Sequence, residues 1–459
     1  MSHLQSPLGP QTTPDRSERG QGDSPRPHAV DAVVVGAGPA GSAAAFALAR
    51  AGRSVVLLER GPYPGSKNVY GGVVYGRILD RIEARWWEQV PVQRWVVRRS
   101  TMVMTPTQAV TLDVRSQAWG AAPYNGMTVY RADFDSWLAS KAVAAGARLV
   151  CSTVATHLLR DKLGHICGVA TDRPDGDLEA RIVIAADGVN SFLAKSAGLH
   201  THADSAHYTL GAKEVLDLAP ELIEQRFALG TREGLDIEAL GATGGIPGGA
   251  FLYTNYDSLS VGVVVALDGL TRSKRRPEEL IADFKSHPAI APYLRNTSLR
   301  EYSAHLIPEG GYDTMPGLVA DGFLVAGDAA NMTLAAGIWL EGVNYAIGAG
   351  LAAGAAAANA LNAGDVSAGG LAGYRRALES GFVLADHSRL RRAPGLVLSE
   401  RVQGVYTRLI CDAAEGIFTV DNTAPKPGLR RLAAGAMRRH QVRVRDLAKD
   451  ALQAARIFR

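Results

Sequence analysis

The sequence predicts an α/β protein with a parallel sheet, a second β-rich domain and a helical C-terminal region. Three observations lead to this prediction. A short β-branched run at 31–35 passes directly into a glycine-rich turn and an alanine-rich helix. Two later apolar runs, 181–186 and 323–326, each end in a turn that contains Gly and Asp. An Ala- and Gly-rich stretch at about 334–361 is long enough for a core helix.

Length and composition limit the class of protein. With 459 residues, and about 150 residues per domain, two to three domains are expected. Hydrophobic residues make up 47% and charged residues 20% of the chain, which is enough apolar material for a sizeable core. The net charge of +4 is too small to indicate a nucleic-acid partner. Residues 1–29 are rich in Ser, Pro, Gln and Gly and are expected to form a disordered leader.

The cysteines and the longest apolar stretch exclude other classes. Cys151, Cys167 and Cys411 are too widely spaced for a disulfide scaffold or for the four thiolates of an iron–sulfur cluster. We therefore expect no bound metal and a reducing, cytoplasmic setting. The 334–361 stretch contains Glu341 and Asn344, so a helix packed inside the protein is expected in place of a membrane span.

The turn after the first strand carries a dinucleotide fingerprint. Its glycines permit a tight turn, close approach of the backbone to a pyrophosphate, and close helix–strand packing. The helix that follows presents unpaired N–H groups and the positive end of its dipole to the phosphates. The residues expected to bind the phosphates are Gly36, Gly38, Pro39, Ala40 and Gly41.

An acidic residue completes this fingerprint. A second strand at 54–58 ends in Glu59 and Arg60, and Glu59 lies 18 residues after Gly41. A carboxylate in this position accepts hydrogen bonds from a ribose diol and repels a 2′-phosphate. The full order of strand, turn, helix, strand and acid therefore predicts a bound dinucleotide, with Glu59 and Arg60 at its sugar.

The ends of the two later strands distinguish FAD from NAD. The first runs into Asp187-Gly188 and the second into Gly327-Asp328. With the first turn, these motifs resemble the Rossmann-like FAD-binding fold of the glutathione-reductase and hydroxybenzoate-hydroxylase type. The resemblance implies that Asp328 binds the ribityl chain and that Arg131, at the start of a helix, lies beside FAD. An ordinary helix N-cap is the alternative role for Asp328.

No second nucleotide motif is expected. Gly348, Gly350 and Gly354 lie inside a helix with no strand before them, so they are expected to let that helix approach the sheet closely. No acid–base catalytic residue is predicted from spacing, because flavin chemistry takes place on the cofactor's own ring.

Four further segments give a more specific resemblance. Together with the FAD motifs they closely resemble FixC-type proteins, flavoproteins related to electron-transfer-flavoprotein:quinone oxidoreductase, from about residue 31 to the C-terminus. This resemblance implies an FAD enzyme that accepts electrons from an electron-transfer flavoprotein and passes them to quinone or to a ferredoxin-like iron–sulfur partner. It also implies that the 65–75 loop, with Gly71 and Gly72, lies over the isoalloxazine. The segments are 65–75, 251–255, 284–288 and 304–311.

Two features leave alternatives open. Residues 425–459 contain ten Lys and Arg but only two Asp, so this tail is basic. The tail could dock a ferredoxin, bind the anionic inner face of a membrane, or simply be a solvated helix face. Relatives commonly carry a His-Arg pair where this chain has Trp339 and Leu340. That departure leaves room for a reductase or monooxygenase of a small or prenyl substrate, like geranylgeranyl reductase. A non-catalytic flavin-binding subunit is the third class.

The expected domain organisation follows from the motifs. The FAD-binding domain is assembled from three segments, and a β-rich substrate or quinone domain is inserted between them. A helical C-terminal region with a basic tail completes the chain. The expected FAD-binding segments are 30–85, 125–205 and 300–360, the substrate segments are 86–124 and 206–299, and the C-terminal region is 361–459.

Overall fold

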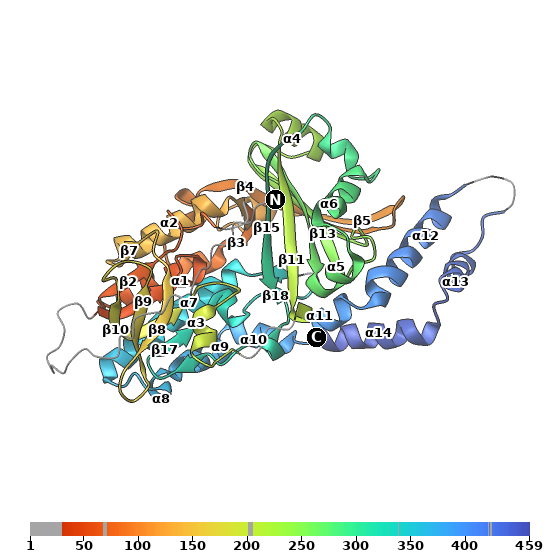
Figure 1. Cartoon of the computed structure of the whole chain (residues 1–459). Helices are drawn as coiled ribbons and strands as arrows, with labels where there is room; N and C mark the ends of the chain where they lie inside the picture. The colour runs from red at the N-terminus through yellow and green to blue at the C-terminus, as the bar shows by residue number, and fades with distance from the viewer. Residues whose placement is uncertain (1–29, 68–70, 201–204, 338, 421, 423–424) are drawn as a thin grey trace, which may run out of the picture.

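The computed structural model describes residues 30–67, 71–200, 205–337, 339–420, 422 and 425–459. The expected leader, 1–29, lies outside the described residues. Two sheets form the body, and helices of the C-terminal region extend from it (Figure 1). The mixed α/β fold with a β-rich second domain and a helical C-terminal region is therefore confirmed.

The first sheet contains the four predicted strands side by side. Strand β1 lies at its centre and pairs in parallel with β10 and β2, and β10 pairs in parallel with β17. The carboxyl ends of these strands therefore meet at one edge of the sheet, as the fingerprint requires. The strands are β1 (Val30–Val35), β2 (Val55–Leu58), β7 (Arg148–Val150), β8 (Ala155–Arg160), β9 (Ile166–Thr171), β10 (Leu178–Ala185), β16 (Val319–Ala320) and β17 (Phe323–Val325).

Helix α1 (Pro39–Arg50) contacts both α2 (Arg131–Ala144) and α7 (Val343–Ala363). A Cβ added to Gly350 or Gly354 of α7 would lie 2.0 Å from Ala40 O or 2.4 Å from Ala44 O. These glycines therefore allow close contact with α1, whereas the sequence predicted an approach to the sheet. By length and composition α7 could cross a membrane, but 72% of its apolar window is buried inside the protein.

The sequence pattern suggested that the long helix follows the strand at 323–326 directly, but the structure shows other elements between them. A short 3₁₀ turn, η7 (Gly327–Ala330), comes first. A small hairpin, β18 (Leu334–Ala335) and β19 (Leu340–Glu341), then leads into α7. The residues after Asp328 therefore form a turn and a hairpin in front of the helix.

The second sheet has one apolar and one polar face. In the described chain it contains nine strands, and its apolar face packs against α4 (Pro220–Phe227), α5 (Leu267–Ser273) and α6 (Pro277–Ser286). Its strands, in spatial order, are β15 (Ser298–Pro308), β11 (Tyr208–Asp217), β14 (Ser258–Ala266), β13 (Gly248–Thr254), β12 (Glu233–Leu240), β4 (Val92–Met104), β6 (Gly126–Val129) and β3 (Gly72–Tyr75), with β5 (Ala109–Arg115) paired to β4.

The boundary between the two sheets differs from the expected domain boundaries. Strands β3, β6 and β15 lie in segments that were assigned to the FAD-binding domain, namely 30–85, 125–205 and 300–360. All three pair within the second sheet. Pairing between strands so far apart in the chain leaves no local sequence pattern. The predicted FAD-binding segments therefore include strands that belong to the second sheet.

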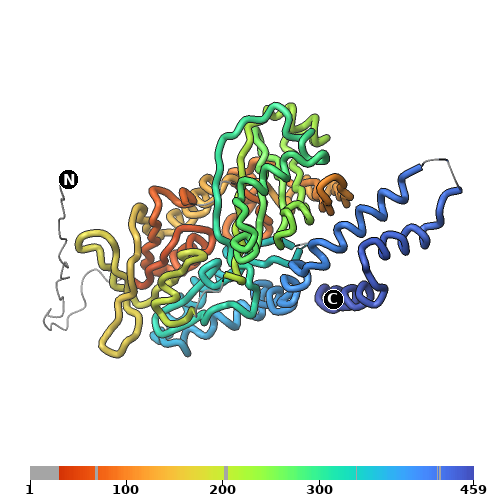
Figure 2. The backbone as a smooth tube through the Cα atoms, turned by 45° about the vertical axis from the view of Figure 1, so that its right-hand side comes forward, coloured from red at the N-terminus to blue at the C-terminus, as the bar shows by residue number. Residues whose placement is uncertain are grey.

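The C-terminal region is helical, and part of it projects from the body. Figures 1 and 2 both show α12 and α13 extending away from the two sheets, with α14 returning toward them. Ion pairs join these helices, Arg439 with Asp412 at 2.8 Å and Arg401 with Asp450 at 2.6 Å. The helices are α8 (Ala368–Leu371), α9 (Gly373–Ser380), α10 (Phe382–Arg389), α11 (Ala393–Val397), α12 (Tyr406–Phe418), α13 (Leu429–Arg439) and α14 (Val444–Ile457).

The contact between α1 and α7 gives a stability prediction. In an exposed helix, Gly→Ala gains about 1 kcal/mol of helix propensity. Gly354→Ala should instead lower stability, because overpacking costs about 1–3 kcal/mol and the added methyl lies 2.4 Å from Ala44 O. Gly435→Ala in α13 is the control, since nothing in the described chain lies within 4 Å of its added Cβ. Thermal unfolding followed by circular dichroism checks this, and a midpoint raised by both substitutions would contradict it.

Candidate functional site

The glycine turn after β1 is held by close backbone contacts. Gly36 has φ +100°, and a Cβ there would lie 2.3 Å from Ala186 O at the end of β10. A Cβ on Gly41 would lie 1.8 Å from Gly36 O. Gly38 differs, because within the described residues nothing lies within 4 Å of its added Cβ. Gly36 and Gly41 are therefore required by the fold, whereas Gly38 leaves open space at the start of α1.

The start of α1 is suited to an anion. Pro39 occupies its first turn, and among the described residues no side chain caps it. The first N–H groups of a helix lack intrahelical partners, and they carry the positive end of the dipole. A diphosphate beside Gly38 would meet these donors at Ala40 and Gly41.

Glu59 joins the end of β2 to the glycine turn. Its side chain is buried, with one carboxylate oxygen accepting from Ala37 N at 3.0 Å and the other from Gly61 N at 2.7 Å. A carboxylate has about four acceptor positions, so two remain for ribose hydroxyls. Arg60, the next residue, is exposed. This geometry places the predicted acid beside the turn, and its contact with ribose stays a prediction.

The turn after β17 lies against the same helix start. Gly327 has φ +70°, and a Cβ there would lie 2.7 Å from Ala40 Cβ. The cap of η7 is Ala326 and not Asp328, so the alternative role of Asp328 as an N-cap is not what the structure shows. Asp328 is therefore brought to the first turn of α1, with its side chain available for another role.

The turn after β10 is also close, but its acid has a structural contact. Asp187 accepts from Ser191 Oγ at 2.8 Å and from Leu193 N at 3.4 Å, at the start of α3 (Phe192–Ser196). Burial raises the pKa of this carboxyl. Gly188 has φ +80°, with open space around its Cα in the described chain. Asp187 therefore orders the turn, and its contact with the cofactor stays a prediction.

Arg131 begins α2, as predicted, and lies among charged groups from other elements. Its guanidinium donates to the Asp135 carboxylate at 2.8 and 2.9 Å. Burial opposes the Arg131 charge, but Asp135, with a smaller contribution from Asp328, raises its pKa above the ordinary value. His305 of β15 is affected by the same groups: burial lowers its pKa, Asp328 opposes this, and Arg131 adds to it. Helix α2, η7 and β15 therefore converge.

Lys213 of β11 is a residue that the sequence analysis missed. Its side chain is buried and its Nζ donates to Gly71 O at 2.6 Å, while residues 68–70 of that loop lie outside the described chain. Burial lowers the pKa of Lys213 to about 7. A single Lys inside this strand of the predicted substrate segment, next to Glu214, was the available signal. Gly72 begins β3, which is an edge strand of the second sheet, and Gly71 directly precedes it.

The polar face of the second sheet has unsatisfied polar atoms. Lys213 lies opposite Ser303 in the strand register, and Gly211 lies opposite His305, so these residues share one face. Ser303 Oγ is buried and has no hydrogen-bond partner among the described residues. Polar atoms in this position fit a ligand with ring nitrogens and carbonyl oxygens, as the isoalloxazine of FAD has. The donor set and this face together fit FAD.

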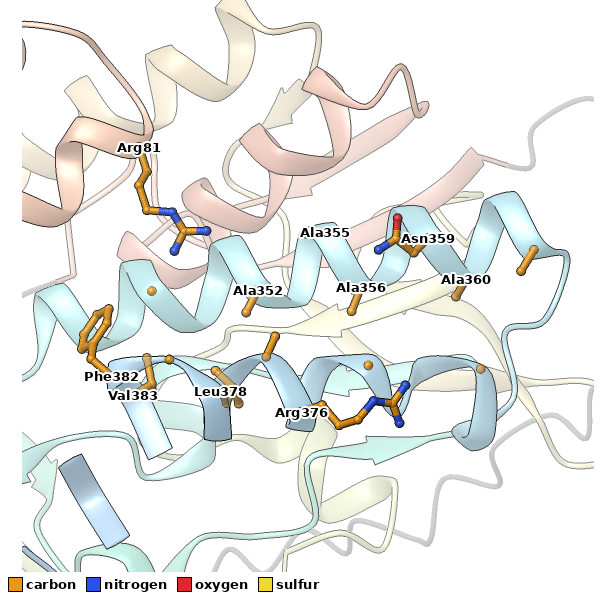
Figure 3. Close-up of a pocket in the computed structure, with 16 residues that line it drawn as sticks. Arg81, Ala352, Ala355, Ala356, Asn359, Ala360, Arg376, Leu378, Phe382 and Val383 are labelled. Atoms are coloured by element: carbon orange, nitrogen blue, oxygen red, sulfur yellow. The ribbon is translucent and has the colours of Figure 1, made fainter. Parts of the chain in front are cut away.

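A cavity away from these residues lies between two helices. It has a volume of about 430 Å³ and lies between α7 and α9, with Arg81 and Arg376 among its lining residues (Figure 3). Small residues such as Ala352, Ala356 and Ala360 form much of its wall. None of the residues predicted to bind FAD lines it. Among the described residues, no group of His, Cys, Asp and Glu side chains could hold a metal ion.

Comparison with known proteins defines the family. Residues 29–231 match the FAD binding domain family, and residues 394–459 match the ETF-QO/FixC family C-terminal domain. Protein FixC of Salmonella typhi is 38% identical over 430 residues, 93% of this chain and 99% of that protein. The probable electron transfer flavoprotein-quinone oxidoreductase YdiS of Escherichia coli strain K12 is 38% identical over 426 residues, 93% of this chain and 98% of the relative.

The chain belongs to the FixC/ETF-QO family. It is an FAD-dependent oxidoreductase of that type. Solved structures agree at the level of fold. A geranylgeranyl bacteriochlorophyll reductase-like protein from Thermoplasma acidophilum has a TM-score of 0.69 at 20% identity, over 92% of this chain and 99% of that one. The flavin-dependent brominase Bmp2 has a TM-score of 0.64 at 15% identity, over 93% and 99%.

In this FixC/ETF-QO family protein, the predicted roles toward FAD follow from where the residues lie. The start of α1 would hold the diphosphate, Glu59 the ribose, and Asp328 the chain beyond it. Arg131, His305 and Lys213 would then lie around the ring. When bound, FAD supplies two-electron redox chemistry at that ring.

The open space at Gly38 gives a binding prediction. Gly38→Ala should fold normally, because its φ of −75° suits alanine and its Cβ meets no described atom within 4 Å. The methyl would nevertheless occupy the space of the diphosphate. We expect FAD affinity to fall at least tenfold while the unfolding midpoint of the FAD-free protein stays the same. Fluorescence titration with FAD measures this, and unchanged affinity would place the diphosphate elsewhere.

Lys213 gives a pH-dependent prediction. Its folded-state pKa of about 7 is below the ordinary value of 10.5, so the unfolded chain binds this proton more tightly. Between about pH 7 and pH 10.5 the free energy of unfolding therefore rises with pH, because the folded protein loses the proton first. Below about pH 7 Lys213 is charged in both states, and the whole cost of burying its charge lowers stability. Lys213→Met should raise the unfolding midpoint more at pH 6 than at pH 9.5. A gain that is equal at both pH values would show that the buried lysine carries no such cost.

Proposed function

We propose that this protein oxidises a reduced electron-transfer flavoprotein and passes the electrons to a quinone. The observation that carries the proposal is the 38% identity to YdiS, a probable electron transfer flavoprotein-quinone oxidoreductase, over 98% of that protein's length. Two features of the structure support it. The turns that contain Gly36, Gly41 and Gly327 meet at the start of α1, and the second sheet has a polar face that carries the stacked rings of Phe251 and Tyr253.

A second route for electrons involves an iron–sulfur partner. The three cysteines are free, and within the described residues no metal-binding group is found. In this route a separate ferredoxin-like partner would carry the iron–sulfur centre. A ferredoxin-like partner would dock on the basic helices α13 and α14. Exposed residues there include Arg430, Arg431 and Arg438, whereas Arg439 pairs with Asp412 of α12. Charge complementarity with an acidic ferredoxin supports this part of the proposal.

The proposed acceptor also gives a location. A quinone of the respiratory type is held in a membrane, so the protein would be cytoplasmic and would contact the inner face of that membrane peripherally. The basic α13–α14 helices suit an anionic lipid surface. Exposed apolar residues near the α12–α13 turn, Phe418 at 82% and Leu429 at 68% exposure, support the same location.

A second candidate function is the reduction of a small apolar or prenyl substrate. The observation that favours it is the apolar segment before Glu341. Trp339 packs against Phe458 with ring centroids 6.0 Å apart, and Leu340 is 46% exposed. An apolar edge at this position would suit an apolar substrate more than a polar partner.

An anaerobic reduction experiment separates these functions. Reduced electron-transfer flavoprotein should bleach the oxidised flavin band of the purified protein, and a water-soluble quinone should restore it. NADPH alone should leave the band unchanged, because the described chain has one dinucleotide turn after a strand. Bleaching by NADPH with formation of a reduced organic product would instead establish the second candidate.

A further inference from the structure

The polar face of the second sheet carries a charged cluster whose role is not explained by the fold. Arg99 of β4 donates to Asp236 Oδ2 at 3.1 Å and to Glu238 Oε1 at 2.9 Å, both on β12. The exposed fractions of these side chains are 22%, 2% and 15%. Asp236 and Glu238, called the carboxyl pair below, thus share a single arginine and carry one negative charge in excess if both ionise.

One atom of the pair lacks a partner. Asp236 Oδ1 is buried and, among the described residues, accepts no hydrogen bond. A buried carboxylate oxygen without a donor is costly, and a proton on the pair removes both that cost and the excess charge. Burial raises the pKa of both carboxyls, and Asp236 raises that of Glu238 further. The pair therefore retains a proton near neutral pH.

The groups that face the pair come from three other strands. The Tyr75 ring of β3 lies 5.7 Å from the Arg99 guanidinium carbon, and Tyr253 of β13 lies opposite Asp236 in the register. Removal from water raises the pKa of both phenols, so they stay neutral. Glu341 of β19 acts electrostatically on Tyr75, and burial raises the pKa of this carboxyl too. Arg99 is thus the one cation among these facing groups.

An aromatic platform lies between the pair and Lys213. Phe251 and Tyr253 stack with centroids 4.7 Å apart and planes 14° apart. The register runs from Glu238 through Phe251 and Gly262 to Lys213. These residues span three strand spacings, about 14 Å in total. A planar ring on this platform would have the carboxyl pair at one end and the position for the flavin, near Lys213, at the other.

A small cavity provides a route from solvent. It has a volume of about 160 Å³ and is lined by Glu341, Asn344, Asp386 and Arg389 among other residues. The Glu341 carboxylate accepts from Asn344 Nδ2 at 2.5 Å, and the Arg389 side chain is 53% exposed. Glu341 therefore lines this cavity and lies near enough to Tyr75 and Arg99 to interact with both electrostatically.

We propose that Asp236 and Glu238 donate one of the two protons consumed when the quinone is reduced, with Arg99 orienting both carboxyls. This inference rests on the proposed function. A quinone takes up two electrons, supplied by the reduced cofactor, and two protons to become a quinol. The pair gives one proton to the carbonyl oxygen at its end of the ring and is recharged from solvent through Glu341. The oxygen at the other end of the ring takes the second proton from solvent water.

The test compares a proton-dependent with a proton-independent acceptor. Ferricenium takes one electron and no proton, so the ratio of the quinone rate to the ferricenium rate isolates proton donation. In Glu238→Gln this ratio should fall about 10²-fold, the usual contribution of a general acid. Glu238→Asp, which keeps an acid, should recover part of it. Glu214→Gln is the matched control, because Glu214 pairs with Lys285 of α6 on the opposite, helix-covered side.

A spectroscopic readout accompanies the rates. In the holoprotein, infrared difference spectra should show a protonated-carboxyl band that disappears as pH rises above neutral, and Glu238→Gln should lose it. The wild-type quinone rate should fall over the same pH range, because a raised pKa keeps the donor protonated only below it. Asp236→Asn provides a second variant if Glu238→Gln fails to fold, as judged by FAD content and unfolding midpoint.

The outcomes separate the inference from the function on which it rests. A wild-type protein that reduces ferricenium but no quinone would overturn the proposed function. A wild-type protein that reduces quinone, with the same rate ratio and pH profile in Glu238→Gln and Asp236→Asn, would overturn the inference alone. The cluster would then be a structural ion pair.

Discussion

The site depends on the close packing of three backbone segments around the first turn of α1. Gly327, at the end of β17, approaches Ala40 Cβ, and Gly350 of α7 approaches Ala40 O. Gly36 meets Ala186 O at the end of β10. At each contact a side chain larger than hydrogen would force the segments apart. The N–H donors at the start of α1 are therefore fixed in position before any ligand binds, which reduces the entropy lost on binding.

The second sheet shows how the fold separates stability from chemistry. Its apolar face, covered by α4, α5 and α6, forms a core of its own. The opposite face carries buried charged groups that would destabilise an ordinary core, among them Lys213 and Asp236. Lys213 shares a register row with Glu238, and Asp236 lies two residues along β12 on the same face. The apolar core of the first face offsets the cost of burying them.

Sequence patterns predicted the parts of the site that are local in the chain. The turn from Gly36 to Gly41, the acid Glu59 and the helix start at Arg131 each follow from a few consecutive residues and lie where they were expected. The carboxyl pair, Lys213 and His305 could not be predicted in this way. Their common face exists only through pairing between strands that are far apart in sequence. The exposed or buried state of a single Lys, Asp or His cannot be read from its neighbours in the chain.

The same distinction explains the domain boundaries. Strand β3 follows the first crossover directly, and local order suggests that it belongs to the first sheet. Its partner is β6, and the second sheet takes up both. Likewise the role of Gly350 and Gly354 was predicted as close packing, but the partner, α1, depends on tertiary structure.

The geometry of the glycine turn predicts that the adenosine diphosphate half of FAD binds at the start of α1 and at Glu59. Calorimetric titration of the flavin-free protein with FAD and with FMN, which lacks the adenosine half, tests this most directly. The structure predicts one FAD per chain, bound at least a hundredfold more tightly than FMN. Equal affinity for the two flavins, or no binding of FAD, would contradict it.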